Sequence, residues 1–212
     1  MGLLTIIRKQ RIKGKEMRLL MLGLDNAGKT TIVRRLKGGQ DLSQVMPTLG
    51  FNIDTLIHKS YSLNIWDVGG QITLRPYWRN YFEATDAIIW VIDSTDRARL
   101  SDTMTELNQL LQEEVSCIRL ASASLLVFAN KQDLAGAMST EEIETVSHHF
   151  GQTHSLLPVS FFFLNSVALD LKGKSNGHRW KVMPCSAISG MNVMEGLDWV
   201  VDEVAGRLYL LQ

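Results

Sequence analysis

The chain has 212 residues, of which 45% are hydrophobic, so it can bury the core of one full domain. Its 22 basic and 22 acidic residues balance, which argues against bulk binding of nucleic acid. Cys117 and Cys185, the two cysteines, lack metal-ligand spacing and fit a reducing, cytoplasmic compartment.

The first 16 residues predict a short amphipathic helix ahead of the main domain, residues 17–212. Its apolar side chains precede a basic run and are Leu3, Leu4, Ile6 and Ile7. Such a helix can lie on an anionic membrane or dock in a partner's groove. The second alternative is favoured, because the myristoylation motif that begins at Gly2 needs Ser or Thr where this chain has Ile6. We expect membrane contact to be weak at most.

The first predicted strand, Arg18–Leu22, runs into the pattern G-x-x-x-x-G-K-[ST] and then into a helix ending near Leu36. A strand before and a helix after are the setting of a phosphate-binding loop. Terminal glycines let successive N–H groups curl around phosphates, and the helix N-terminus adds its dipole. Lys29 is expected at the β- and γ-phosphates and Thr30 on Mg²⁺. The candidate nucleotide-binding residues are Gly23, Leu24, Asp25, Asn26, Ala27, Gly28, Lys29, Thr30 and Thr31.

Two later loops predict segments that respond to the bound nucleotide. Thr48 lies in a loop-like stretch from which it can close over Mg²⁺. Asp67 ends an apolar run, where phosphate-loop enzymes place a carboxylate linked to Mg²⁺. The N–H of Gly70 can approach the γ-phosphate, and Gln71 can orient the attacking water.

The remaining elements alternate between apolar strands and amphipathic helices. The predicted strands are Ile53–His58, Tyr61–Trp66, Ala87–Asp93, Ser124–Ala129 and Trp180–Met183, and the predicted helices are Asp102–Glu114 and Asn192–Leu208. The first two strands are close enough to form an antiparallel hairpin across Lys59-Ser60. Trp90 and Trp199 lie on apolar runs and are expected in the core. The alternation predicts an α/β fold with a doubly wound sheet and nucleotide loops at the carboxyl ends of its strands.

Two motifs at the ends of late strands predict recognition of guanine. Asp133, within Asn130-Lys131-Gln132-Asp133, can accept hydrogen bonds from guanine N1 and the exocyclic amine, which adenine cannot supply. An analogue without these donors would leave the carboxylate unpaired, which gives strong discrimination. Ser186 and Ala187 follow the last strand, and the Ala187 N–H can reach guanine O6.

In this order the motifs resemble those of small GTPases of the ADP-ribosylation-factor-like branch. The segments that carry the resemblance are Gly23–Thr30, Pro47–Asn52, Trp66–Gln71, Arg75–Phe82 and Asn130–Asp133. The resemblance implies a P-loop NTPase fold with a mostly parallel six-stranded sheet flanked by helices. It also implies a GTP/GDP switch with slow hydrolysis, in which Gln71 and Lys29 are catalytic and Thr30, Thr48 and Asp67 hold Mg²⁺.

The resemblance further implies partners. Residues 1–6 look like those of members associated with tubulin-folding cofactors and with carriers of lipidated proteins, which implies a cytoplasmic or cytoskeleton-associated protein. Phe51, Trp66 and Tyr81 match an aromatic trio that related proteins present to effectors, although ordinary packing explains each residue equally well. Turnover is expected to depend on an activator, because no arginine is an obvious built-in finger. The alternatives are a membrane-recruited trafficking GTPase and a nucleotide-binding scaffold with little turnover.

The segment Val146–Asn165 departs from the family pattern. It interrupts a helix that begins near Ser139 and contains Pro158, which costs about 3 kcal/mol inside a helix. An exposed run of Phe161, Phe162 and Phe163 would suit an insert that recruits a partner. We favour a translated intron, because Val-Ser and Phe-Phe-Phe-Leu-Asn are what in-frame splice junctions encode. Aligning the transcript with its genome tests this hypothesis, and the absence of splice-competent junctions would reject it.

Overall fold

The computed structural model describes residues 14–39, 42, 45–82, 85–116, 123–143 and 180–210. The predicted N-terminal helix lies outside these residues except for positions 14–16. The 146–165 segment lies outside them altogether.

A single six-stranded sheet organises the described residues. Its strands are β1 (Glu16–Leu22), β2 (Phe51–His58), β3 (Tyr61–Val68), β4 (Ala87–Asp93), β5 (Ser124–Asn130) and β6 (Trp180–Pro184), in the order β2-β3-β1-β4-β5-β6. All neighbours pair in parallel except β2 and β3, where His58 pairs with Tyr61 across the predicted hairpin. The fold class is therefore confirmed, and the five parallel strands end at one edge.

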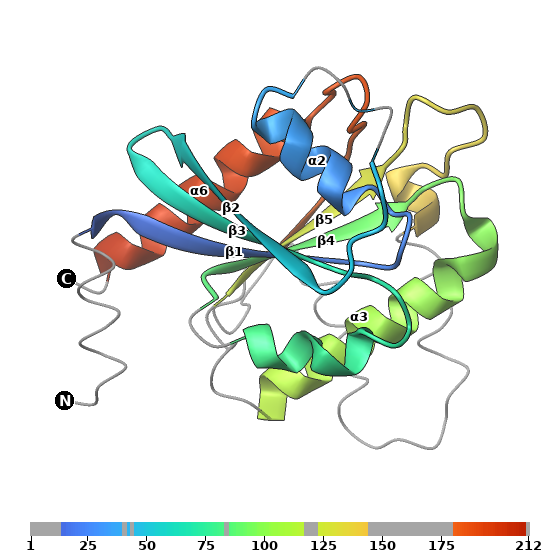
Figure 1. Ribbon diagram of the computed structural model, residues 1–212, viewed down its shortest axis with the longest axis horizontal. Coiled ribbons are helices and arrows are strands. Elements are labelled where there is room, and N and C mark those ends of the chain that lie inside the picture. The colour runs from blue at the N-terminus through green and yellow to red at the C-terminus, as the bar shows by residue number, and fades with distance from the viewer. Residues whose placement is uncertain are drawn as a thin grey trace.

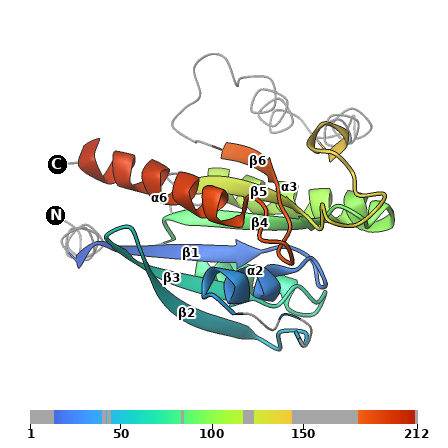
Figure 2. The ribbon, with the colours of Figure 1, turned by 90° about the horizontal axis from the view of Figure 1, so that it is seen from above.

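Helices cover both faces of this sheet (Figures 1 and 2). The elements are α2 (Lys29–Leu36), α3 (Leu100–Ser116), α6 (Val193–Leu210) and the 3₁₀ helices η1 (Arg75–Tyr81) and η2 (Arg97–Arg99). Leu19 and Met21 belong to the core that α2 and α6 complete, whereas Leu20 and Leu22 belong to the core under α3 and η1. Successive side chains of a buried strand alternate between two apolar layers.

The two predicted core tryptophans differ. Trp90 is fully buried and meets Trp78 of η1 edge-on, with ring centroids 5.6 Å apart. Trp199 packs against the core but stays partly exposed, so its assignment to the core is confirmed only in part. On α6 the buried stripe is formed by Val193, Leu197, Val200, Val201 and Val204, and position 199 lies beside that stripe.

None of the described helices combines the length and the apolar character needed to cross a membrane.

Two glycines of α6 provide a matched test of how tightly this helix packs against β5. A Cβ atom on Gly196 would lie 2.3 Å from Cζ of Phe128 and 2.5 Å from its Cε1, whereas nothing lies within 4 Å of one on Gly206. We expect Gly196→Ala to destabilise the protein by about 1–3 kcal/mol through overpacking. Gly206→Ala should stabilise it by about 0.5–1 kcal/mol, because alanine favours the helix. Urea unfolding of both variants checks this, and a destabilised Gly206→Ala together with an unaffected Gly196→Ala would contradict it.

Candidate nucleotide-binding site

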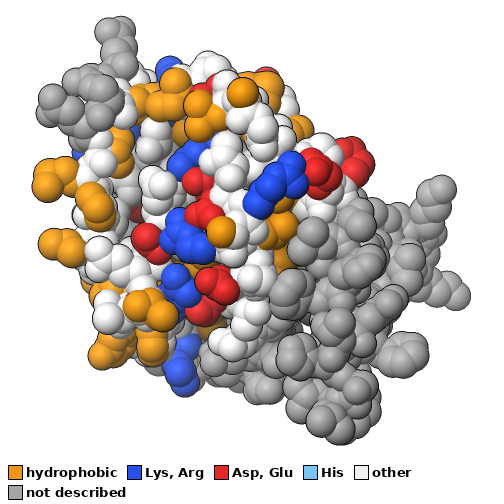
Figure 3. Space-filling model, turned by 90° about the vertical axis from the view of Figure 1, so that its right-hand side faces the viewer, with side chains coloured by type: hydrophobic (Ala, Val, Ile, Leu, Met, Phe, Trp, Pro, Cys, Tyr) orange, Lys and Arg blue, Asp and Glu red, His pale blue; other side chains and the backbone are white. Residues whose placement is uncertain are grey.

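The loops after the parallel strands meet on one face of the molecule. Figure 3 shows this face, where basic and acidic side chains alternate across the middle and hydrophobic ones gather along the left edge. Exposed apolar side chains occur in both predicted switch segments and in β2, and they include Met46, Leu49, Phe51, Ile53, Ile72 and Tyr77. The face therefore combines a charged centre with an apolar border.

The loop between β1 and α2 follows a path that requires glycine at two positions. Gly23 and Gly28 have φ values of 136° and 96°. A Cβ atom on Gly23 would lie 2.2 Å from the Val91 carbonyl oxygen, and one on Gly28 would lie 2.3 Å from Nδ2 of Asn130. Asn26 is also left-handed, with φ 61°. Leu24 and Ala27 are buried, whereas Asp25 remains partly exposed.

The loop opens onto the N-terminus of α2, which suits an anion. The first turn of α2 holds no acidic residue, and no side chain caps it, so the N–H groups of Lys29, Thr30 and Thr31 can serve a phosphate. The Lys29 ammonium donates to the carbonyl oxygens of Gly23 and Leu24 at 2.8 and 2.7 Å. Burial lowers the pKa of Lys29 to about 8, although Asp67 and Asp25 favour its charged form. Phosphate oxygens would compensate this buried cation.

Three oxygen-bearing side chains meet beside Lys29. The Thr30 hydroxyl lies 2.8 Å from that of Thr48 and donates to Oδ2 of Asp67 at 2.7 Å, and Thr48 Oγ1 lies 3.3 Å from the same oxygen. The other carboxylate oxygen, Oδ1, is buried without a hydrogen-bond partner. Burial raises the pKa of Asp67, although the two hydroxyls and Lys29 oppose that rise.

These oxygens fit Mg²⁺, which prefers hard oxygen ligands and retains several waters and phosphate oxygens. The orphaned Oδ1 atom is a further acceptor that water bound to the metal would satisfy. Within the described ranges, no group of three or more His, Cys, Asp or Glu residues could hold a metal. Two hydroxyls and one carboxylate are therefore the set to test, as the sequence predicted.

The loop after β3 lies directly against the phosphate loop. A Cβ atom on Gly70 would lie 2.3 Å from the carbonyl carbon of Leu24 and 2.4 Å from the Gly23 oxygen, so glycine is required by close approach. Gly69 donates to the Gly50 carbonyl at 2.8 Å, and Gln71 is half-buried beside them. The two predicted switch segments thus touch both each other and the phosphate loop.

The loops after β5 and β6 form the opposite end of the site. Asn130 is buried; its Nδ2 donates to the Ala27 carbonyl at 2.8 Å, and its Oδ1 accepts from the Ala187 N–H at 3.0 Å. Ser186 donates to Oδ1 of Asp133 at 2.6 Å. The predicted base-reading residues therefore do come together. The Ala187 N–H donates to Asn130, a contact that the sequence did not reveal.

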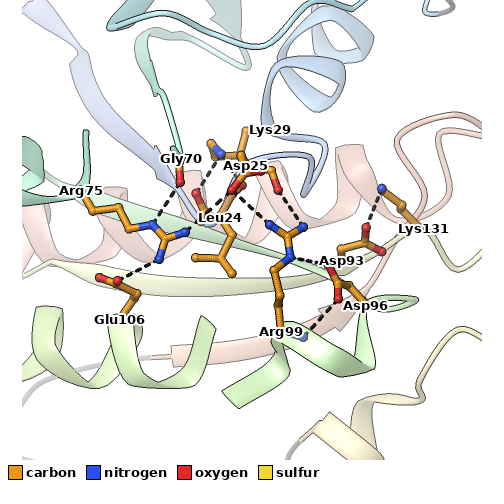
Figure 4. A network of polar contacts seen from close by, with 11 residues as sticks. Leu24, Asp25, Lys29, Gly70, Arg75, Asp93, Asp96, Arg99, Glu106 and Lys131 are labelled. Atoms are coloured by element: carbon orange, nitrogen blue, oxygen red, sulfur yellow. Dashed lines mark hydrogen bonds and ion pairs between the residues drawn. The ribbon is translucent and has the colours of Figure 1, made fainter. Parts of the chain in front are cut away.

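Sequence reasoning missed the ion pairs that hold these loops. Lys131 donates to Asp93 at 2.6 Å. Although burial alone would raise the pKa of Asp93, hydrogen bonds from Lys131 and Thr95 lower it. The phosphate-loop Asp25 accepts from Arg99 at 3.1 Å, as Figure 4 shows. The sequence showed only that an acidic residue, Asp25, lies inside the phosphate-binding loop. It did not identify Arg99 as the partner of this residue.

The aromatic trio forms one cluster beside the switch segments. The ring centroids lie 5.4 Å apart for Phe51 and Trp66, 5.3 Å for Phe51 and Tyr81, and 5.8 Å for Trp66 and Tyr81. Arg18 supports the cluster with its guanidinium carbon 3.8 Å from the Trp66 ring centroid. Phe51 is 44% exposed. The rings therefore pack against one another, as ordinary packing predicts, and also leave an accessible surface, as contact with an effector would require.

Known proteins match this chain along its whole length. Residues 3–204 match the ADP-ribosylation factor family. Proteins named ADP-ribosylation factor-like protein 2 from Dictyostelium discoideum, Arabidopsis thaliana and Drosophila melanogaster are 52%, 50% and 47% identical, with 100% of both chains covered. The solved structure of the Arl6 small GTPase from Trypanosoma brucei, with the bound nucleotide analogue GppNp, is similar with a TM-score of 0.70 at 26% identity. That similarity covers 91% of this chain and 99% of the other.

The Asn130 amide provides the first test of the site. Asn130→Asp replaces a buried donor with an acceptor that faces the Ala27 carbonyl, and we expect a loss of about 1–3 kcal/mol in stability together with weaker nucleotide binding. Asn64→Asp is the matched control, because Asn64 Oδ1 accepts from Thr55 at 2.8 Å and a carboxylate preserves that acceptor. Urea unfolding and nucleotide titration measure both effects. Equal behaviour of the two variants would contradict the bridging role.

Proposed function

We propose specific roles in GTP binding and hydrolysis for the residues at the edge of the sheet. The chain belongs to the ADP-ribosylation factor family. As an Arf-family small GTPase it binds GTP and GDP with Mg²⁺, hydrolyses GTP and acts as a switch. The observation that carries the proposal is the meeting of Thr30, Thr48 and Asp67 beside the phosphate loop.

In the proposed mechanism, the chain senses the γ-phosphate with two loops. Thr48 comes from the first, and its hydroxyl already lies beside Thr30 and Asp67. Gly70 comes from the second, and its close approach to the phosphate loop lets its N–H serve the γ-phosphate. Thr30 and Thr48 would hold Mg²⁺ with Asp67 in its shell, and the bound metal would supply positive charge to compensate the phosphate oxygens. Loss of the γ-phosphate would release both loops.

Hydrolysis needs an oriented water molecule and a group that compensates the negative charge on the phosphate oxygens. Gln71 positions the water in line with the γ-phosphate, and the Lys29 ammonium stabilises negative charge on the phosphate oxygens. Arg75 and Arg99, the arginines described beside the phosphate loop, are held by acidic partners. We therefore propose slow intrinsic turnover that an activator accelerates by supplying an arginine.

At the base end, Asp133 reads guanine N1 and the exocyclic amine while Ser186 fixes its carboxylate at 2.6 Å. The Ala187 N–H reaches guanine O6 as a donor shared with Asn130. Lys131, with φ 70° and its ammonium on Asp93, shapes the loop between them.

For the biological role, we propose regulation of tubulin folding and microtubule biogenesis and release of lipidated cargo from carrier proteins. The relatives named ADP-ribosylation factor-like protein 2 and the resemblance of residues 1–6 support this role. The effector surface would be centred on Phe51, Trp66 and Tyr81, and residues 1–16 would form an extension of the 17–212 domain. Protein loaded with GppNp should bind a tubulin-folding cofactor or a lipid carrier, whereas GDP-loaded protein and Phe51→Ala should not. Flotation with anionic vesicles instead would favour the trafficking alternative.

Gln71→Leu tests the catalytic assignment. We expect it to abolish activator-stimulated hydrolysis, because leucine cannot orient water, while GTP affinity stays nearly unchanged. Single-turnover hydrolysis and nucleotide titration measure the two quantities, with Thr73→Val, an exposed position of the same loop, as control. A large loss of GTP binding, or full stimulated turnover, would count against the role. If the wild-type protein shows no turnover with any activator, the scaffold alternative is favoured.

Asp133→Asn tests recognition of the base. An amide can donate to the 2-oxo group of xanthine and no longer accepts two hydrogen bonds from guanine, so preference should move from guanosine toward xanthosine nucleotides. Competition between the two nucleotides measures the shift. Asp202→Asn makes the same chemical change on the exposed side of α6 and should leave the preference unaltered. Unchanged selectivity in Asp133→Asn would refute the assignment.

A further inference from the structure

Arg75 joins three segments, which are the loop after β3, the phosphate loop and α3 (Figure 4). It is the first residue of η1. Its Nε donates to the Gly70 carbonyl at 3.1 Å, and its Nη1 donates to Glu106 of α3 at 2.9 Å. Its Nη2 lies 3.8 Å from Oδ1 of Asp25 in the phosphate loop. The side chain is only 12% exposed, so these contacts fix it.

Only a guanidinium can make this set of contacts. Its donors stand in a rigid planar fork and can address three acceptors at once, whereas the lysine ammonium is a single point charge. Glu106 and Asp25 compensate the mostly buried cation. Asp25 is itself braced by Arg99, whose Nη1 donates to the same Oδ1 atom at 3.1 Å. The guanidinium of Arg75 is therefore committed to structure and is not free to swing onto a phosphate.

A second residue of η1 acts on the adjacent peptide. Trp78 is buried, and its Nε1 donates to the Gly69 carbonyl at 3.0 Å. A trans peptide is planar, so the Gly69 C=O and the Gly70 N–H point in opposite directions. The tryptophan therefore fixes the direction of the Gly70 N–H, while Arg75 fixes the next peptide plane, which carries the N–H of Gln71. Two glycines would otherwise leave both planes free to rotate.

We propose that Arg75 is a positioning residue for recognition of the γ-phosphate: by holding the Gly70 carbonyl it fixes the Gly70–Gln71 peptide plane, and together with Trp78, which holds the plane that carries the Gly70 N–H, it keeps this glycine in the GTP-binding geometry. This inference rests on the proposed role of the Gly70 N–H. It implies that Arg75 sets the preference for GTP over GDP and the orientation of Gln71, because GDP has no γ-phosphate for Gly70 to contact.

The test compares Arg75→Ala and Arg75→Lys with Arg79→Ala. Arg79 lies in the same 3₁₀ helix, is exposed and donates to the Pro76 carbonyl of its own turn. With Mg²⁺ present, affinity is measured separately for GDP and for the hydrolysis-resistant analogue GppNp, and intrinsic hydrolysis is followed in single turnovers. Both Arg75 variants should lose about tenfold in affinity for GppNp, as expected for one charge-assisted hydrogen bond. GDP affinity should change less than about twofold.

Intrinsic hydrolysis should fall by about tenfold in both Arg75 variants and remain unchanged in Arg79→Ala. A merely structural role would weaken GDP and GppNp binding equally, and that result overturns the proposal. So does rescue by Arg75→Lys, because the fork geometry is then not required. If Arg75→Ala fails to fold, Glu106→Gln replaces it, because glutamine keeps a hydrogen-bond acceptor for Arg75 but removes the counter-charge. An unaltered ratio of GppNp affinity to GDP affinity in both Glu106→Gln and Arg75→Lys would again overturn the proposal. If wild-type protein binds neither guanine nucleotide, the proposed function fails instead.

Discussion

The buried amide of Asn130 joins the two ends of the pocket, and the geometry of the site depends on it. Its Nδ2 donates to Ala27 in the phosphate loop and its Oδ1 accepts from Ala187 in the base loop. β5, which ends at Asn130, lies between β4 and β6 in the sheet, so this side chain bridges loops that follow β1 and β6. The amide needs both its donor and its acceptor to do this, and it thereby links the phosphate loop to the loop after β6. Gly28 has no side chain for the same reason, since a Cβ atom there would collide with Nδ2.

Around that bridge the protein keeps polar groups that its own side chains satisfy only in part. Lys29 is buried with a lowered pKa, and one oxygen of Asp67 is buried without a hydrogen-bond partner. Such groups oppose folding unless a ligand compensates them. A nucleotide with its metal supplies both the anion and the cation, so binding and folding are linked. At a free nucleotide concentration about 1,000 times the dissociation constant, the folded state gains about 4 kcal/mol of stability. The fold and its nucleotide are therefore parts of one equilibrium.

Much of the phosphate loop could be predicted from the sequence, because its backbone geometry requires particular residue types at a fixed spacing. The phosphate loop needs glycine at Gly23 and Gly28, and alternation of apolar runs placed every strand of the sheet. What could not be read are contacts between distant elements. Nothing local pairs Asp25 with Arg99, and the shared N–H of Ala187 depends on the side chain of Asn130 across the strand end. The prediction for Trp199 was right only in part, because this residue packs against the core from a position beside the buried stripe of α6 and stays partly exposed.

The two switch segments are mechanically one unit, because they are the two ends of the same hairpin. β2 begins at Phe51, three residues after Thr48, and β3 ends at Val68, two residues before Gly70. The bond from the Gly69 N–H to the Gly50 carbonyl, at 2.8 Å, extends their ladder past both strand ends. At the other end of the hairpin, His58 and Lys59 contact Asp198 and Asp202 of α6. The ladder ties the two strands residue by residue, so we expect the two loops that extend from it to move together. The aromatic trio includes Phe51 of β2 and Trp66 of β3, so the hydrogen bonds of this ladder connect the loops of the proposed γ-phosphate site with the proposed effector surface.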